Sequence, residues 1–480
     1  MKLKNLLLWG PLLLLLIFAF SFRLYKINEP IADWHSWRQT DTAAVSKLFV
    51  QNGIDVLHPR YFDISNVQSG FDNPQGYRFV EFPLFNVIHV TLYSVIGVWS
   101  LDVWARLTTI LFSLIAITFI FLLVKKYLSV RAAYAAAFFY AFLPFSIFYG
   151  RTVLPDTAMI ASVLGGIYFF SVWADQNSHR VSNYLYLLLA LVFTAISLLF
   201  KPYALFFFLP IAVLSFEKFG WSAFKKIPLW IFAILSVIPL VLWRIWITQF
   251  PEGIPVSSWL FNAGNIRFKG AYFYWIFGER ISQLILGYYV TFAIIGLFKR
   301  ATEKHFWFYI SFFVSSLVYL IVIARGNVQH DYYQIAIVPS LAILIGRGID
   351  YILSIPGKLN KVIAVAVIVV NTFLMFSLSW YHVRDYFNIN NREMVEAGIV
   401  ADAILPKDAK VIAPREGDTT LLYYINRQGW PHLQESIEEL IQKGATHMII
   451  LDPSEQSIAE YQQKYSIVAS ESAYLIMKLK

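Results

Sequence analysis

The apolar residues of this chain gather into long runs that short polar segments separate. Most runs are about 18 to 20 residues long, which is the length that a helix needs to cross the hydrocarbon core of a bilayer. The pattern predicts eleven membrane spans, at residues 6–22, 106–124, 132–149, 157–173, 183–199, 203–216, 227–247, 281–298, 306–324, 335–354 and 362–380. The first run resembles a signal peptide, but bulky residues follow it where a cleavage site needs small ones, so we interpret it as an uncleaved span. The predicted fold class is therefore mainly α, a polytopic membrane protein.

The run from Pro83 to Val98 is shorter and contains Asn86 and His89, so it fits either a short span or a helix lying at the membrane surface. Basic residues decide between the two, because cytoplasmic loops are enriched in lysine and arginine. If residues 83–98 do not cross, one side of the membrane collects the basic clusters, which are Lys2, Lys4, Lys125, Lys126, Arg131, Arg180, Lys218, Lys225, Lys226, Lys299, Arg300, Lys304, Lys358 and Lys361. We therefore predict an N-terminus in the cytoplasm, with residues 23–105, 248–280 and 381–480 outside the cytoplasmic (inner) membrane.

The segment after about Asn388 has a different pattern from the rest of the chain. Strand-like residues 410–413 and 447–451 alternate with helix-like residues 419–427 and 434–443. Two domains are predicted: residues 1–380 form a transmembrane catalytic domain that carries the outer loop 23–105, and residues 381–480 form a small extracytoplasmic α/β domain. Because a loop of about 80 residues is too long for a passive connector, it is the place to look for chemistry.

Composition supports a membrane protein. Charged residues make up 14% of the chain and hydrophobic residues 58%, whereas an average soluble domain has about 25% charged residues. The formal net charge of +9 comes from short basic clusters between apolar runs and not from one basic face, which excludes a nucleic-acid partner. With no cysteine, disulfides, thiolate metal sites and cysteine nucleophiles are also excluded.

The densest polar cluster follows the first span. Asp33, His35, Arg38 and Asp41 lie within about ten residues of one another. Carboxylates, an imidazole and a guanidinium beside a membrane are suited to binding a phosphate and removing a proton. The alternative is an interfacial aromatic belt, since tryptophans stand between these residues.

Each further candidate for the site could instead have a purely structural role. In its structural role, Glu81, just before Pro83, would only complement a helix dipole. Asp156, which follows Arg151, would only cap a helix, and Lys201 would only extend outward from an apolar span. The last polar cluster stands at the outer end of a span, and its members are Arg325, His330, Asp331, Tyr332 and Tyr333.

These motifs follow one another in a recognisable order. An acidic motif in a long first outer loop is followed by Glu-x-Pro-Leu, Arg-x-x-x-Pro-Asp, Lys-Pro and His-Asp-Tyr-Tyr. The ordered set resembles the GT-C superfamily of membrane glycosyltransferases, in the branch of protein O-mannosyltransferases and lipid A aminoarabinose transferases. The resemblance covers about residues 1–380.

The resemblance implies transfer of a single sugar from a polyprenyl-phosphate donor to a lipid, glycan or protein acceptor, on the outer face and with inversion at the anomeric carbon. It implies a carboxylate general base, with Asp33 as the first candidate, Asp41 as its rival and Asp156 as a further catalytic residue. Glu81 and His330 match positions that hold a divalent metal ion or orient the donor phosphate. The implied phosphate and substrate contacts are His35, Arg38, Arg151, Lys201, Arg325, Asp331, Tyr332 and Tyr333.

A divalent metal ion is thus the only cofactor implied. The chain has no Gly-rich phosphate loop, so no nucleotide cofactor is expected; a lipid donor arrives through the membrane, and membrane lipids are the surrounding partners. Two alternatives stay open: a glycan polymerase or ligase, which would move a whole glycan, and a flippase or transporter. Ion-coupled transporters place ionisable residues deep in their helices, whereas the predicted spans are almost free of charge.

Overall fold

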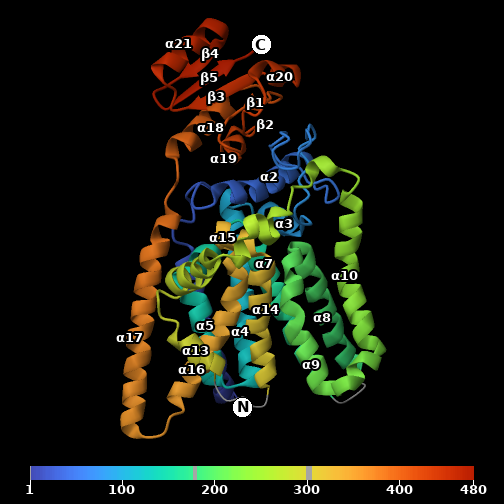
Figure 1. Cartoon of the computed structure of the whole chain (residues 1–480), viewed down its shortest axis with the longest axis vertical. Helices are drawn as coiled ribbons and strands as arrows, with labels where there is room; N and C mark the ends of the chain where they lie inside the picture. Colours follow the sequence, from blue (N-terminus) through green and yellow to red (C-terminus); the bar gives the residue numbers. More distant parts are fainter. Residues whose placement is uncertain (1, 177–180, 299–304) are drawn as a thin grey trace. The chain divides into compact units, whose positions relative to one another are not determined.

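The structure, a computed structural model, describes residues 2–176, 181–298 and 305–480. The chain forms two compact units, each built from several segments (Figure 1). Unit 1 comprises Met1–Tyr25, Leu107–Leu242 and Ser257–Asp385, and unit 2 comprises Lys26–Arg106, Trp243–Val256 and Tyr386–Lys480. Arg180, Lys299, Arg300 and Lys304 of the topology prediction lie outside the described residues.

Unit 1 is a bundle of apolar helices. Its helices are α1 (Lys2–Arg23), α4 (Leu101–Tyr127), α5 (Val130–Phe142), α6 (Pro144–Tyr149), α7 (Asp156–Asp175), α8 (Val181–Phe200), η1 (Pro202–Phe208), α9 (Leu209–Phe219), η2 (Gly220–Lys225), α10 (Ile227–Ile247), α11 (Trp259–Asn262), η4 (Ala263–Phe268), α12 (Gly270–Phe273), η5 (Tyr274–Ile285), α13 (Thr291–Phe298), α14 (Phe306–Val322), α15 (Ala324–Gln329), η6 (Asp331–Ile337), α16 (Val338–Leu353) and α17 (Lys358–Val383). Two of these helices, α4 and α10, continue into unit 2. In the described part of the chain, 6 helices are long and apolar enough to cross a membrane, and further apolar helices are shorter. The predicted fold class is confirmed, while the number of crossings stays a prediction.

Two predicted spans are interrupted. The span predicted at residues 132–149 divides into α5 and α6, because Pro144 disfavours a helical conformation at Leu143, whose φ and ψ are −54° and 126°. The prediction of one continuous span at 281–298 is wrong: η5 ends at Ile285, Gly287 and Tyr288 have φ of 49° and 71°, and α13 begins only at Thr291. Only glycine fits at 287, since a Cβ there would lie 2.4 Å from the Met375 carbonyl oxygen.

The basic ends of the unit 1 helices lie together. Figure 1 shows the start of α1, the turn between α9 and α10 and the turn between α16 and α17 at one end of the bundle. Lys225, Lys226 and Lys358 belong to these turns. This shared end is what the charge pattern predicts for a cytoplasmic face, whereas the orientation itself stays a prediction.

Unit 2 joins the first outer loop to the C-terminal region. Its elements are α2 (Ser36–Asn52), α3 (Leu84–Ile96), η3 (Pro251–Gly253), η7 (Arg384–Phe387, whose first two residues belong to unit 1), α18 (Arg392–Ile404), β1 (Val411–Ile412), α19 (Thr420–Ile425), β2 (Gly429–Trp430), α20 (Ile437–Gln442), β3 (His447–Leu451), α21 (Glu455–Lys464), β4 (Ser466–Ser470) and β5 (Tyr474–Lys478). With 13 residues, α3 is about 20 Å long, too short for a bilayer core of about 30 Å.

The five strands form one sheet in the order β2-β1-β3-β5-β4. β1 pairs in parallel with β2 and β3, while β5 is antiparallel to β3 and β4. The strand-like and helix-like segments predicted between residues 410 and 451 are confirmed as β1, α19, α20 and β3. The sequence analysis did not predict β2, α21, β4 or β5.

The outer loop extends this sheet. The Ile64 amide donates to the Gly429 carbonyl oxygen at 3.0 Å, and the Gly429 amide donates to the Phe62 carbonyl oxygen at 2.9 Å. Ile64 also packs into the same apolar core as Ile412 and Trp430. The contacts therefore group the outer loop with the C-terminal region, whereas the sequence analysis places that loop in the catalytic domain.

Candidate active site

The sequence-predicted site residues divide between the two units. Asp33, His35, Arg38, Asp41 and Glu81 lie in unit 2, on or beside α2. Arg151, Asp156, Lys201, Arg325, His330, Asp331, Tyr332 and Tyr333 lie in unit 1.

Asp33 is a buried carboxylate, and this residue is 1% exposed. Oδ1 accepts from the Gln39 Nε2 amide at 2.6 Å, and Oδ2 lies 3.4 Å from Arg106 Nη2. Arg106 also stabilises the backbone of this loop, because its guanidinium donates hydrogen bonds to the carbonyl oxygens of Ile27 and Glu29. An amide and a guanidinium therefore both help to hold this carboxylate in place.

Asp41 is held by an ion pair and a hydrogen bond. Oδ2 accepts from Arg78 Nη2 at 2.6 Å, and Oδ1 accepts from the Thr419 hydroxyl at 2.7 Å. Its side chain is fully buried. Both oxygens of Asp41 thus have a close donor, one of them a cation.

Arg38 and Glu81 form an ion pair with each other. Arg38 Nη2 lies 2.5 Å from Glu81 Oε1, and Arg38 Nη1 donates to the Thr42 hydroxyl at 3.1 Å. Glu81 therefore does more than complement the dipole of α3. A phosphate at Arg38 or a metal ion at Glu81 would have to compete with this pair.

Asp63 is a third buried carboxylate of unit 2. It accepts from the Ser65 amide at 2.8 Å and from the Tyr61 hydroxyl at 3.3 Å. Burial raises the pKa of Asp63 from 3.8 to about 6, although the hydrogen bonds from Ser65 oppose this shift. Nothing in the sequence marks this residue beyond its carboxylate.

Unit 1 contains a second buried acid–base pair. Lys201 Nζ contacts both carboxylate oxygens of Asp156, at 2.8 and 2.9 Å. Both residues are buried, so Lys201 does not extend outward from its span. Asp156 does not cap α7 either, because the N-cap residue is Pro155. Neither structural alternative of the sequence analysis therefore applies to this pair.

Tyrosine rings surround the ammonium group. Lys201 Nζ lies 5.5 Å from the ring centres of Tyr203 and Tyr332 and 5.3 Å from that of Tyr333. Tyr332 and Tyr333 stack with centroids 4.6 Å apart, and His330 stacks on Tyr332 at 5.4 Å. These rings stabilise a cation at this position.

The neighbouring groups have different partners. Asp331 accepts from the Tyr149 hydroxyl at 2.6 Å, and Arg151 Nη1 donates to the Tyr25 carbonyl oxygen at 2.7 Å. Arg325 is half-buried on α15 and makes no hydrogen bond or ion pair with any residue that the structure describes. Arg325 is therefore the cation of this group that is available to an anion without breaking a contact.

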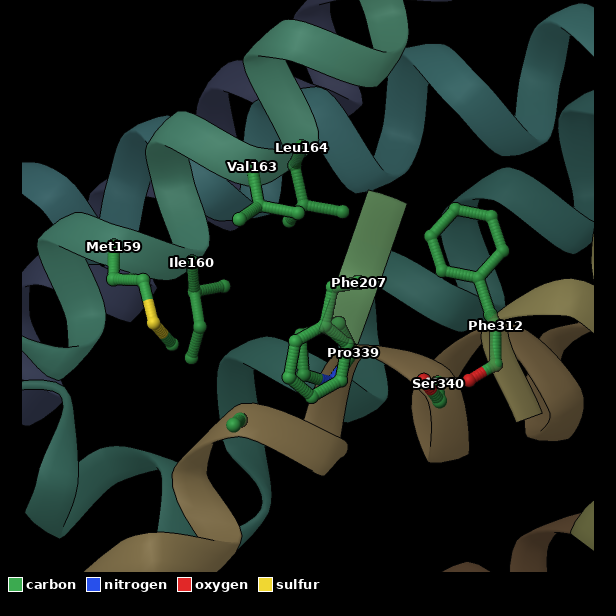
Figure 2. A pocket seen from close by; sticks show the side chains of 9 residues that line it. Met159, Ile160, Val163, Leu164, Phe207, Phe312, Pro339 and Ser340 are labelled. Carbon is green, nitrogen blue, oxygen red and sulfur yellow. Dashed lines mark hydrogen bonds between the residues drawn. The ribbon is translucent and has the colours of Figure 1, made fainter. Parts of the chain in front are cut away.

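An apolar cavity lies one helical turn further along the same elements (Figure 2). Its free volume is about 20 Å³, room for about one water molecule, and its lining is contributed by α7, η1, α14, η6 and α16. Met159 and Ile160 follow Asp156 by about one turn, and Phe207 follows Lys201 within η1. The hydroxyl of Ser340 in the wall donates to the Phe312 carbonyl oxygen at 2.9 Å, which leaves the cavity itself apolar.

A metal site is not formed by any cluster within the described residues. No group of three or more His, Asp or Glu side chains gathers there as a cation site, and Glu81 is paired with Arg38. Two protein ligands alone would hold a divalent ion weakly.

Sequence reasoning did not single out Gln39, Arg78, Arg106 and Thr419 as site residues. Arg106 carried a signal, since it is a charged residue near the start of a long apolar helix. Arg78 and Thr419 carried none, because they reach Asp41 only through tertiary folding.

Comparisons with known proteins agree on the fold. Residues 83–246 match the family described as dolichyl-phosphate-mannose-protein mannosyltransferase. ArnT from Cupriavidus metallidurans bound to undecaprenyl phosphate has a similar structure, with a TM-score of 0.67, 14% identity and 98% of both chains covered. No curated protein matches the sequence.

Archaeal oligosaccharyltransferases from Archaeoglobus fulgidus are also similar. The structure in complex with Zn and sulfate has a TM-score of 0.60 and 12% identity, covering 96% of this chain and 72% of that one. AglB in complex with an inhibitory peptide and a dolichol-phosphate has a TM-score of 0.54 and 9% identity, covering 95% and 72%. The predicted resemblance is thus confirmed: the chain is a multi-pass membrane protein with the GT-C fold that ArnT also has, and its residues 83–246 match the mannosyltransferase family.

Proposed function

We propose that this protein is an inverting glycosyltransferase that moves a single sugar from a polyprenyl-phosphate donor to a lipid, glycan or protein acceptor. The reaction takes place at the outer face of the cytoplasmic membrane, and Asp33 is the general base. The donor phosphate binds near Lys201 and Arg325.

The observation that carries this proposal is the group of cations at the ends of apolar helices in unit 1. Lys201, ringed by three tyrosines, follows α8, and Arg325, half-buried on α15, makes no hydrogen bond or ion pair with any described residue. Cations beside apolar helices suit a ligand with an anionic head and an apolar tail, as a polyprenyl phosphate has. The family match over residues 83–246 supports the same class of donor.

The chemical step balances with these groups. The acceptor hydroxyl oxygen attacks the anomeric carbon while its proton passes to the Asp33 carboxylate. The bond between the anomeric carbon and the phosphate oxygen breaks, and its electron pair stays on the polyprenyl phosphate. By the resemblance to the GT-C enzymes, cations stabilise the negative charge that develops on this leaving group, and Lys201 and Arg325 are the proposed ones. Attack opposite to the leaving group inverts the anomeric configuration.

Asp33 is the proposed base because it lies in the densest polar cluster of the outer loop. Asp41 is held in an ion pair with Arg78 at 2.6 Å, and Asp156 in one with Lys201 at 2.8 Å. Arg106 Nη2 lies 3.4 Å from the Asp33 carboxylate. His35, Arg38, Arg151, Asp331, Tyr332 and Tyr333 remain proposed substrate contacts, and a metal at Glu81 and His330 remains a prediction.

The test is an assay of the purified full-length protein with synthetic polyprenyl-phosphate monosaccharides. We expect transfer by the wild type, loss of at least about a hundredfold in turnover for Asp33→Asn, and wild-type turnover for the control Asp408→Asn, whose side chain is exposed. Near-normal turnover in Asp33→Asn would move the base elsewhere. No transfer from any monosaccharide donor by the wild type would overturn the proposal.

A second donor class belongs in the same assay. The fold similarity to the archaeal oligosaccharyltransferase extends over 96% of this chain, which favours transfer of an oligosaccharide as the other candidate. A lipid-linked oligosaccharide donor that is used while all monosaccharide donors fail would select this candidate.

A further inference from the structure

Trp34 stands beside the proposed base and is partly exposed. The residue is 38% exposed, whereas its neighbour Asp33 is 1% exposed. A large aromatic side chain that remains open to solvent next to buried charges is more often a contact surface than part of a core.

The backbone just after Trp34 is strained. His35, which precedes α2, has φ of 56° and ψ of 37°, a left-handed conformation that non-glycine residues rarely adopt. Such strain persists only where the surroundings fix it and is frequent at functional sites. Asp33 is buried here, while Trp34 keeps exposed surface and its ring contacts that of His35, with centroids 5.0 Å apart.

Trp34 is fixed by the C-terminal region. Its ring stacks on that of Tyr386 with centroids 4.8 Å apart and an interplanar angle of 14°, and its amide donates to the Tyr386 carbonyl oxygen at 3.1 Å. Gln39 Nε2 donates both to the Trp34 carbonyl oxygen at 2.9 Å and to the Asp33 carboxylate at 2.6 Å. One amide group thus links the backbone of Trp34 to the carboxylate of the proposed base.

We infer that Trp34, supported by Tyr386, is the platform on which a pyranose ring stacks during transfer. An aromatic face is electronegative at its centre, and the C–H groups on one face of a pyranose are suited to it. A ring already held by a parallel neighbour loses little entropy on binding. The inference rests on the proposed function, since the pyranose is either the transferred sugar or the sugar of a glycan acceptor.

The alternative is that Trp34 contacts lipid headgroups, where tryptophan is common. A lipid contact would not distinguish a pyranose from an open-chain polyol. Binding of small sugars therefore separates the two ideas without depending on catalysis.

The experiment is saturation-transfer difference NMR on the detergent-solubilised full-length protein, with methyl α-mannopyranoside and related methyl pyranosides as probes and sorbitol as the open-chain comparison. We expect saturation of the pyranoside ring protons in the wild type and a loss of about three- to tenfold in Trp34→Ala. Trp34→Phe keeps an aromatic face and should retain most of the signal. Trp99→Ala is the matched control, because Trp99 is another exposed tryptophan of unit 2, 53% exposed.

Two further measurements make the result decisive. Tyr386→Leu removes the support without touching Trp34 and should weaken the signal in a protein with wild-type size-exclusion behaviour. Initial rates with a synthetic polyprenyl-phosphate mannose show which sugar stacks on Trp34. A raised KM for this donor in Trp34→Ala places the donor sugar on the platform, and an unchanged KM places the acceptor sugar there.

Pyranoside saturation that is absent in the wild type, equal for sorbitol, or unchanged in Trp34→Ala would overturn the inference. Saturation that depends on Trp34 in a protein that transfers nothing would leave this binding site standing and reject the proposed function alone.

Discussion

Asp41 shows how the partners of a carboxylate define its role. Arg78 and Thr419 occupy its two oxygens, and the side chain is buried. Asp41→Asn removes the charge that neutralises the buried Arg78, and breaking a buried ion pair in this way costs about 3–5 kcal/mol. We expect a clear fall in the melting temperature of the purified Asp41→Asn protein. An Asp41→Asn protein that melts at the wild-type temperature would contradict this structural role.

Asp63 predicts a pH dependence of stability. Its pKa is raised from 3.8 to about 6, so between these values the folded protein binds a proton that the unfolded chain has released. The free energy of unfolding contributed by this group is therefore highest below pH 4 and falls as the pH rises through about 6, by on the order of 3 kcal/mol. Asp63→Asn should remove this fall, which melting curves of both proteins between pH 4.5 and 7.5 would reveal. A constant difference between the two curves would show that Asp63 does not titrate in this range.

At the residue scale, the sequence predicted residue types but not their pairing. The cluster of Asp33, Arg38 and Asp41 was visible because these residues are close in the chain. Their partners are not, since Arg38 meets Glu81 and Asp41 meets Arg78 and Thr419. Long-range pairs of this kind leave no periodic signal in one sequence.

Among the elements, those with strong apolar periodicity were predictable and those shaped by tertiary contacts were not. The long apolar helices were found from composition and length alone. The break at 286–290 was missed because it depends on how closely α17 approaches Gly287. β4 was missed because only alternate residues of Ser466–Ser470 are even partly buried, which leaves a weak apolar pattern.

The contact between α19 and α2 predicts a role for the C-terminal region in the site. The Thr419 hydroxyl, just before α19, donates to Asp41 on α2, and α2 also carries Gln39, which donates to Asp33. Thr419→Val keeps the shape but leaves Asp41 without this donor, which should lower the free energy of unfolding by about 1–3 kcal/mol and reduce kcat more than KM. Thr419→Ser should restore both, because it returns the hydroxyl. A Thr419→Val protein with wild-type kcat would show that this contact does not position the site.

At the scale of the whole molecule, basic residues carried most of the information about topology. Figure 1 shows the turns that contain Lys225, Lys226 and Lys358 at one end of unit 1, as the enrichment of cytoplasmic loops in lysine requires. The grouping of the outer loop with the C-terminal region was not predictable, because it rests on backbone hydrogen bonds such as that between Ile64 and Gly429.

The orientation of the chain is testable because it has no cysteine. A single cysteine introduced at Ser472, an exposed residue before β5, should react with a membrane-impermeant maleimide in intact spheroplasts, since residues 381–480 are predicted outside. A cysteine introduced at Ser222, exposed in the turn before Lys225, should react only after the membrane is opened. If Ser222→Cys reacted in intact spheroplasts and Ser472→Cys did not, the whole topology would be inverted, and the carboxylate of Asp33 would face the cytoplasm instead of the outer side.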